Sequence, residues 1–141
     1  IECRLIVETE AAALAAGRAG EEGRSALVGA LDAMTDAARR RGGNSRAERT
    51  YREAELRFDR ALTDAAGNPA LARVAEPIQR AFDMAQPAGT AGRARLERGL
   101  ADRRRILEAV VRQEPEEARE AMRQHLLSEA EELREGVRSR A

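Results

Sequence analysis

The only histidine of the chain, His125, and one arginine, Arg103, fall on the apolar faces of predicted helices. At about 100° per residue, His125 shares a narrow face with three apolar residues, Ala118, Ala121 and Met122. Arg103 lies at the centre of an apolar stripe made by Leu96, Leu100, Leu107 and Val110. A buried guanidinium cannot lose its charge, so it needs an anionic partner or a ligand. Two inward polar groups on successive helices therefore predict a functional site in the interior.

Two carboxylates and a second arginine extend this set of inward polar residues. Glu55 and Asp59 lie one helical turn apart, so they share one face of a predicted helix, where they flank its apolar stripe. Arg4 keeps register with the inward residues of the first predicted helix. The candidate site is therefore Arg4, Glu55, Asp59, Arg103 and His125.

This set allows three kinds of interior. It could be a salt-bridge network, in which Arg103 pairs with Glu55 or Asp59 and which stabilises little beyond what apolar packing would give. It could be a ligand pocket, because a guanidinium binds a carboxylate through two parallel, charge-assisted hydrogen bonds and His125 could add a donor. It could be a metal site, in which Glu55, Asp59 and His125 ligate a divalent ion of the Zn or Ni type.

The metal and enzyme interpretations are the weaker ones. The fixed charge of Arg103 would oppose a cation, and the chain has neither a second histidine nor an H-E-x-x-H motif. No metal or other cofactor is therefore favoured. An enzyme could use Glu55, Asp59 and His125 as acid–base groups, but the sequence offers no nucleophile and no second titrating partner. We therefore do not predict catalytic residues.

Composition predicts one helical domain. A chain of 141 residues suits a single core. Aromatic residues make up only 2%, so alanine and leucine must build that core, which favours helix-on-helix packing over a β-sandwich. The formal net charge is zero, which argues against nucleic-acid binding by these residues alone. A single cysteine, with no signal peptide and no apolar run near about 18 residues, predicts a cytoplasmic protein without a membrane partner.

Periodicity and punctuation predict an all-α, antiparallel bundle of about six to seven helices. Six can be placed, at about residues 2–18, 24–40, 45–65, 69–85, 93–112 and from 115 onward. Gly20 and Gly23 are expected to separate the first two, and Gly42 and Gly43 to cap the second. The third should open on a capping box from Ser45 to Glu48.

The fourth predicted helix has the best-defined beginning in the chain. Gly67, Asn68 and Pro69 supply a C-terminal glycine, an N-cap and a proline at the first helical position. Its inward face is expected to be Leu71, Val74, Ile78 and Phe82, and Pro77 could kink it.

Four segments, taken in order, resemble the FCD domain. They are residues 4–16 (RLIVE followed by AAALAA), 55–69 (ELRFDRAL and AAGNP), 102–110 (DRRRILEAV) and 116–126 (EEA to AMRQHL). The FCD domain is the C-terminal, effector-binding domain of one large branch of the GntR-type bacterial transcription regulators. The resemblance covers nearly the whole chain and implies an effector pocket inside a helical bundle.

The resemblance also implies where a metal would be held, and this chain departs from that pattern. The family site has one acid and three histidines. Glu55 stands at the acid position, whereas Asp59 and Arg103 stand at the first two histidine positions and only His125 keeps the residue type. Some members bind effector without metal, and this chain looks similar to those. Arg103 could occupy the volume of the ion or meet the carboxylate of the effector.

The resemblance implies a function and partners as well. Residues 1–141 would form a single effector-binding and dimerisation domain, and an upstream winged helix-turn-helix domain that binds DNA would be missing from this chain. A small organic acid, either a carboxylic or a sugar acid, would bridge Arg103, His125 and Arg4 in a homodimer. The alternative is a structural or dimerisation module with an internal salt-bridge network and no ligand.

Overall fold

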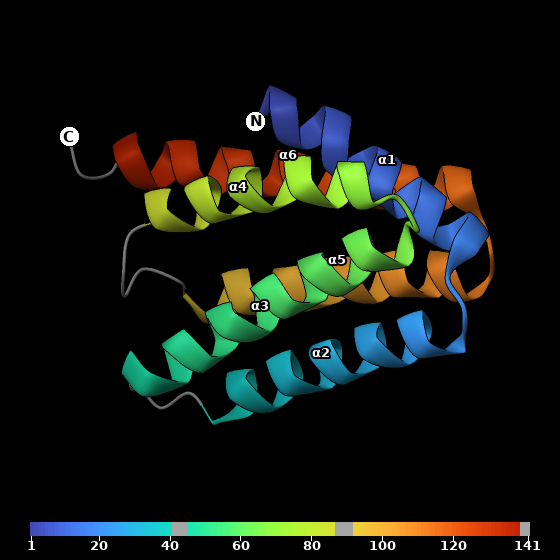
Figure 1. Ribbon diagram of the computed structural model, residues 1–141. Coiled ribbons are helices and arrows are strands. Elements are labelled where there is room, and N and C mark those ends of the chain that lie inside the picture. Colours follow the sequence, from blue (N-terminus) through green and yellow to red (C-terminus); the bar gives the residue numbers. More distant parts are fainter. Residues whose placement is uncertain (41–44, 87–91, 139–141) are drawn as a thin grey trace.

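A computed structural model describes residues 1–40, 45–86 and 92–138. Within these ranges it contains six helices and no strands: α1 (Glu2–Arg18), α2 (Glu21–Arg39), α3 (Ser45–Ala65), α4 (Pro69–Ala85), α5 (Arg93–Val111) and α6 (Pro115–Arg138). Consecutive helices run in opposite directions along one bundle (Figure 1). None of these helices combines the length and the apolar character that a membrane crossing requires. The predicted all-α bundle is confirmed.

Gly23 does not separate α1 from α2, as the sequence suggested, but lies inside the first turn of α2. A Cβ atom added to Gly23 would lie 3.3 Å from the Cβ atom of Ala65 on α3. The residue therefore marks a close approach between two helices. The connection between α1 and α2 consists only of Ala19 and Gly20.

Asn68 caps α4 as predicted. Its side-chain oxygen accepts hydrogen bonds from the backbone N–H groups of Ala70 and Leu71, at 3.1 and 3.2 Å. Gly67 before it has a φ of 64°, which an L side chain rarely adopts. The capping roles expected of Ser45 and of Gly42 and Gly43 lie outside the described residues and side chains.

The turn between α5 and α6 is a Schellman motif that the sequence did not reveal. The backbone N–H of Glu114 donates to the carbonyl of Ala109, and that of Gln113 donates to the carbonyl of Val110, at 3.0 and 3.1 Å. Gln113 has a φ of 58°, the left-handed conformation in which glycine is normally found at this position.

Replacing Gln113 with glycine is expected to stabilise the protein by roughly 0.5–1 kcal/mol, because the left-handed conformation strains a residue that has a Cβ atom. The free energy of unfolding in urea measures the effect. Glu114→Gly in the same turn is the matched control and should destabilise or leave stability unchanged. An equal gain from both variants would contradict the explanation.

The core is built mostly from alanine, leucine and methionine. Along α1 the side chains of Ala11, Ala12, Ala15 and Ala16 are buried against the other helices. Such small side chains allow helix axes to approach closely. The apolar stripe of α3, which Glu55 and Asp59 flank, is buried as well and consists of Tyr51, Ala54, Phe58 and Leu62.

The predicted inward face of α4 is wrong in one respect. Val74 has 50% of its surface exposed, whereas Ala75 and Gln79 are buried. The other three predicted residues, Leu71, Ile78 and Phe82, are only partly buried. Because α4 packs on α1 and α3, the face that carries Ala75 and Gln79 meets those neighbours and Val74 turns away.

A space between α3 on one side and α5 and α6 on the other determines where the polar residues lie. Among the described residues, no Cα atom of α3 lies within 8 Å of a Cα atom of α5 or α6. By contrast, α3 packs closely on α1, α2 and α4. Long side chains must therefore fill the space, and many of them are charged.

Candidate functional site

Arg103 occupies the centre of this space and bridges α5 to α3. Its side chain is only 2% exposed, and its two terminal nitrogens lie 3.4 Å from Glu55 Oε1 and 3.6 Å from Asp59 Oδ1. The guanidinium also lies over the ring of Phe58, at 5.9 Å from the ring centroid. The structure therefore brings three of the predicted site residues together as one buried ionic group.

Arg4 forms a second ionic group with residues that the sequence analysis did not select. It donates to both carboxylate oxygens of Glu8, at 2.7 and 3.1 Å, and to Glu129 on α6 at 2.8 Å. Its guanidinium stacks on the ring of Phe82 from α4, 4.0 Å from the centroid. Like Arg103, it satisfies two carboxylates at once.

His125 lies between two carboxylates from different helices. Its Nδ1 is 3.2 Å from Asp102 on α5, and its Nε2 is 3.4 Å from Glu129, one turn further along α6. The imidazole is 2% exposed, and within the described structure Nε2 has no hydrogen-bond partner. Glu129 therefore connects His125 to Arg4.

Burial and neighbouring charges shift the pKa values of two of these acids in opposite directions. Burial raises the pKa of Glu55 to about 7, although the positive charge of Arg103 opposes that rise. Burial alone would also raise the pKa of Glu129, but the charges of His125, Arg4 and Arg103 lower it to about 2. The surrounding positive charges thus compensate the negative charge of Glu129 well and that of Glu55 poorly.

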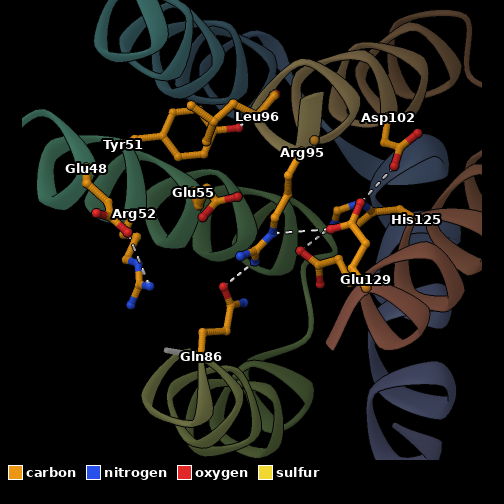
Figure 2. A pocket seen from close by; sticks show the side chains of 12 residues that line it. Glu48, Tyr51, Arg52, Glu55, Gln86, Arg95, Leu96, Asp102, His125 and Glu129 are labelled. Carbon is orange, nitrogen blue, oxygen red and sulfur yellow. Dashed lines mark hydrogen bonds and ion pairs between the residues drawn. The ribbon is translucent and has the colours of Figure 1, made fainter. Parts of the chain in front are cut away.

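A small cavity lies beside this network, between α3, α5 and α6 (Figure 2). Its free volume is about 20 Å³, which is enough for the centre of about one water molecule. Of the predicted residues, Glu55 and His125 line it, whereas Arg4, Asp59 and Arg103 do not. Arg103, which pairs with Asp59, also contacts the lining residue Glu55, and Arg4 contacts the lining residue Glu129.

Arg95 lies across the cavity and joins three helices. Its Nε is 3.2 Å from Glu132 on α6, and a terminal nitrogen donates to Gln86 at the end of α4 (Figure 2). The side chain is 24% exposed. Two arginines of the described chain line the cavity, Arg52 from α3 and Arg95 from α5. Arg95 is therefore a partly exposed cation in the cavity wall.

Part of what was missed had a signal in the sequence. Glu8 follows Arg4 by one helical turn, and Glu129 follows His125 by one turn, so each acid shares a face with a selected residue. Asp102 directly precedes Arg103. Nothing in the local sequence distinguishes Arg95, because its place depends on how α4, α5 and α6 meet.

The side chains do not fit the metal site that the resemblance implies. The guanidinium of Arg103 lies between Glu55 and Asp59, so a fixed positive charge occupies the space next to those carboxylates. Both ring nitrogens of His125 face other acids. Within residues 1–40, 45–86 and 92–138, no group of three or more histidine, cysteine or acidic side chains is placed to hold an ion.

Adding ZnCl₂ or NiCl₂ to the purified chain is expected to cause neither stoichiometric binding nor a rise in melting temperature. The reason is that a divalent cation near Glu55 and Asp59 would be repelled by Arg103. Isothermal titration calorimetry and elemental analysis of protein prepared without chelator are the measurements. One bound ion per chain would contradict this prediction.

Comparison with known families agrees with the arrangement of the helices. The sequence profile of the FCD domain matches residues 1–128, which is most of the chain. A search of curated protein sequences finds no match to this chain. The match includes α1 to α5 and the part of α6 that carries His125. The chain therefore belongs to the FCD domain family.

Proposed function

We propose that this chain is the ligand-sensing and dimerisation domain of a cytoplasmic GntR-type transcription regulator. In this proposal, a small organic acid binds inside the bundle, and DNA is bound by a separate winged helix-turn-helix domain. Membership of the FCD family supports a regulatory, effector-binding role. It also supports a homodimer and argues against an enzyme.

The observation that carries the proposal is the cavity between α3, α5 and α6, on which the side chains of Glu55, His125 and other charged residues converge. Burying charged groups costs free energy, and apolar residues of similar volume would often stabilise a core as well or better. Polar groups that converge on a cavity can orient a bound ligand, which makes this cavity the candidate binding site.

The arrangement suggests how a bound acid could change the domain. Side chains from α3, α4, α5 and α6 meet at the cavity, and Arg95 links α5 to two of these helices. A ligand larger than a water molecule must displace some of these contacts. It can shift the relative positions of the helices, and of DNA-binding domains joined to them, only by its difference in affinity for the two arrangements.

A thermal-shift panel of glycolate, pyruvate, gluconate and related hydroxy, keto and sugar acids tests the proposal. A ligand at about 100 times its Kd adds about 2.7 kcal/mol, or roughly 5–10 °C in a domain of this size. Calorimetry should then give a Kd, and light scattering after size exclusion should give a dimer. If no organic acid of any class, amino acids included, produces a shift, effector binding is contradicted.

A structural module without a ligand is the second candidate. It is favoured by the pairing of Arg4 and Arg103, each of which already contacts two carboxylates. It predicts a dimer whose melting temperature responds to none of these compounds. The same panel therefore separates a sensor from a scaffold.

A further inference from the structure

The lining of the cavity carries more negative than positive charge. Its acids are Glu48, Glu55, Asp102, Glu129 and Glu132. Its arginines are Arg52 and Arg95, and His125 can add one more positive charge. The residues behind the wall do not alter this excess, because Arg4 and Arg103 are matched there by Glu8 and Asp59. A ligand that is only anionic would add to the excess.

Arg95 is the arginine best placed to receive a carboxylate. Arg4 and Arg103 are buried and lie outside the cavity lining, each in contact with two acids. The partner of Arg95, Glu132, also accepts a hydrogen bond from Arg98 Nε at 2.8 Å. If Arg95 exchanged Glu132 for a ligand carboxylate, Glu132 would keep a cation, so the exchange leaves no charge unpaired.

The opposite side of the cavity is suited to a positively charged donor. Glu55 is the poorly neutralised acid of the site, as its pKa of about 7 indicates. A Cβ atom at Gly99 would lie 3.9 Å from Glu55 Oε1 but only 3.2 Å from the Tyr51 hydroxyl and 3.5 Å from a terminal nitrogen of Arg103, so the wall beside Glu55 is closely packed. A cationic donor would therefore lie further along the cavity, where Asp102 and Glu129 line it.

His125 provides an independent indication of a missing partner. Its Nε2 faces the same cavity, is buried, and has no hydrogen bond within the described structure. Nδ1 lies 3.2 Å from Asp102 Oδ2 and Nε2 lies 3.4 Å from Glu129 Oε1, so a donor placed beside Nε2 would also meet a carboxylate. An ammonium group can donate to both Nε2 and that carboxylate and replace the positive charge of a protonated ring.

We propose that the cavity takes a small zwitterion of the amino-acid type. Its carboxylate is bound by Arg95, and its ammonium group lies between Asp102 and Glu129, beside Nε2 of His125. This inference rests on the proposed function and specifies the organic acid. Because the free volume is only about 20 Å³, the side chains of Arg95 and Glu132 must move outward when the ligand binds.

Matched compounds test the ligand class. Glycine, L-alanine, L-serine and L-aspartate are compared by thermal shift and calorimetry with their 2-hydroxy acid counterparts and with the amines that lack the carboxylate. We expect at least one amino acid to bind, and its hydroxy-acid and amine counterparts to bind roughly 10- to 100-fold more weakly, because each loses a charged hydrogen-bonding group.

Two arginine variants test the position of the carboxylate. Arg95→Gln should weaken binding of that amino acid by roughly 10- to 100-fold. Arg93→Gln is the matched control, since Arg93 is an exposed arginine of the same helix that does not line the cavity, and it should change the Kd by less than about twofold. Circular dichroism and the melting temperature without ligand should show that both variants fold.

The outcomes separate this inference from the proposed function. If hydroxy, keto or sugar acids bind and amino acids do not, the effector-binding function stands and the assignment of a zwitterionic ligand is wrong. Unchanged affinity in Arg95→Gln would also overturn the inference. If no compound of any class binds, both are contradicted.

Discussion

Replacing Arg103 with methionine is expected to lower the free energy of unfolding by roughly 3–5 kcal/mol. The substitution removes the positive charge that Glu55 and Asp59 share and leaves their carboxylates in the space between the helices without it. Methionine approximately fills the volume of the arginine stem, so the loss reports on charge more than on packing. Urea unfolding followed by far-ultraviolet circular dichroism measures the effect.

Removing the two acids together with Arg103 should recover most of that stability. In the triple variant Arg103→Met, Glu55→Leu and Asp59→Leu, no buried charge of this group is left without a partner, and apolar side chains replace the ionic ones. We expect it to be within about 1 kcal/mol of the unaltered chain or more stable. A triple variant as unstable as Arg103→Met would show that the ionic group itself stabilises the fold.

Between about pH 4.5 and 7, the free energy of unfolding is expected to decrease in the unaltered chain because Glu55 ionises. Replacing Glu55 with glutamine should abolish that decrease. The pKa of Glu55 is about 7 in the folded protein and 4.5 when unperturbed, so the folded state holds this proton over a range in which the unfolded state has released it. Stability from this group is therefore full below the unperturbed value and declines as pH rises through that range, by up to about 3 kcal/mol.

The comparison must account for the groups that face Glu55. Arg103 and Arg95 from α5, Glu129 from α6 and Asp59 from α3 all act on its charge, with burial as the largest influence. Denaturant unfolding at pH 5 and at pH 8 should show Glu55→Gln with a smaller decrease than the unaltered chain. Glu53→Gln, exposed on the same helix, is the control. Equal decreases in all three proteins would contradict the raised pKa.

The low pKa of Glu129 gives a dependence of opposite sign. Its charged form is stabilised by folding, so this contribution is present above pH 4.5 and is lost as pH falls toward about 2. Acid titration therefore separates the two acids, because Glu55 acts on the neutral side and Glu129 on the acidic side of their common unperturbed value.

The helices could be predicted from the sequence because local signals determine them. The segment Gly67-Asn68-Pro69 carries its own capping chemistry, and the structure places the start of α4 there. The role of Gly23 could not be predicted in this way, since glycine both ends helices and lets helices approach, and only the position of Ala65 on α3 distinguishes the two roles.

The site was only partly predictable because its pairs depend on tertiary distances. Helical periodicity correctly indicated that Arg4, Arg103 and His125 point inward. It could not indicate that His125 meets Asp102 and Glu129, whereas Glu55 and Asp59 meet Arg103. That division arises because α3 stays more than 8 Å from α5 and α6, measured between Cα atoms, so contacts across the space are made by long side chains such as Arg103 and Tyr51.

The alanine-rich contacts of α1 determine which parts of the interior can rearrange. Ala12 and Ala15 are fully buried and have no side-chain rotamers, so the helix surfaces there cannot adapt by changing side-chain conformation. Rotameric freedom near the bundle centre belongs instead to the long charged side chains, such as Arg95 and Glu132. A ligand that orders those side chains loses conformational entropy locally, and any longer-range response must be a rigid movement of whole helices.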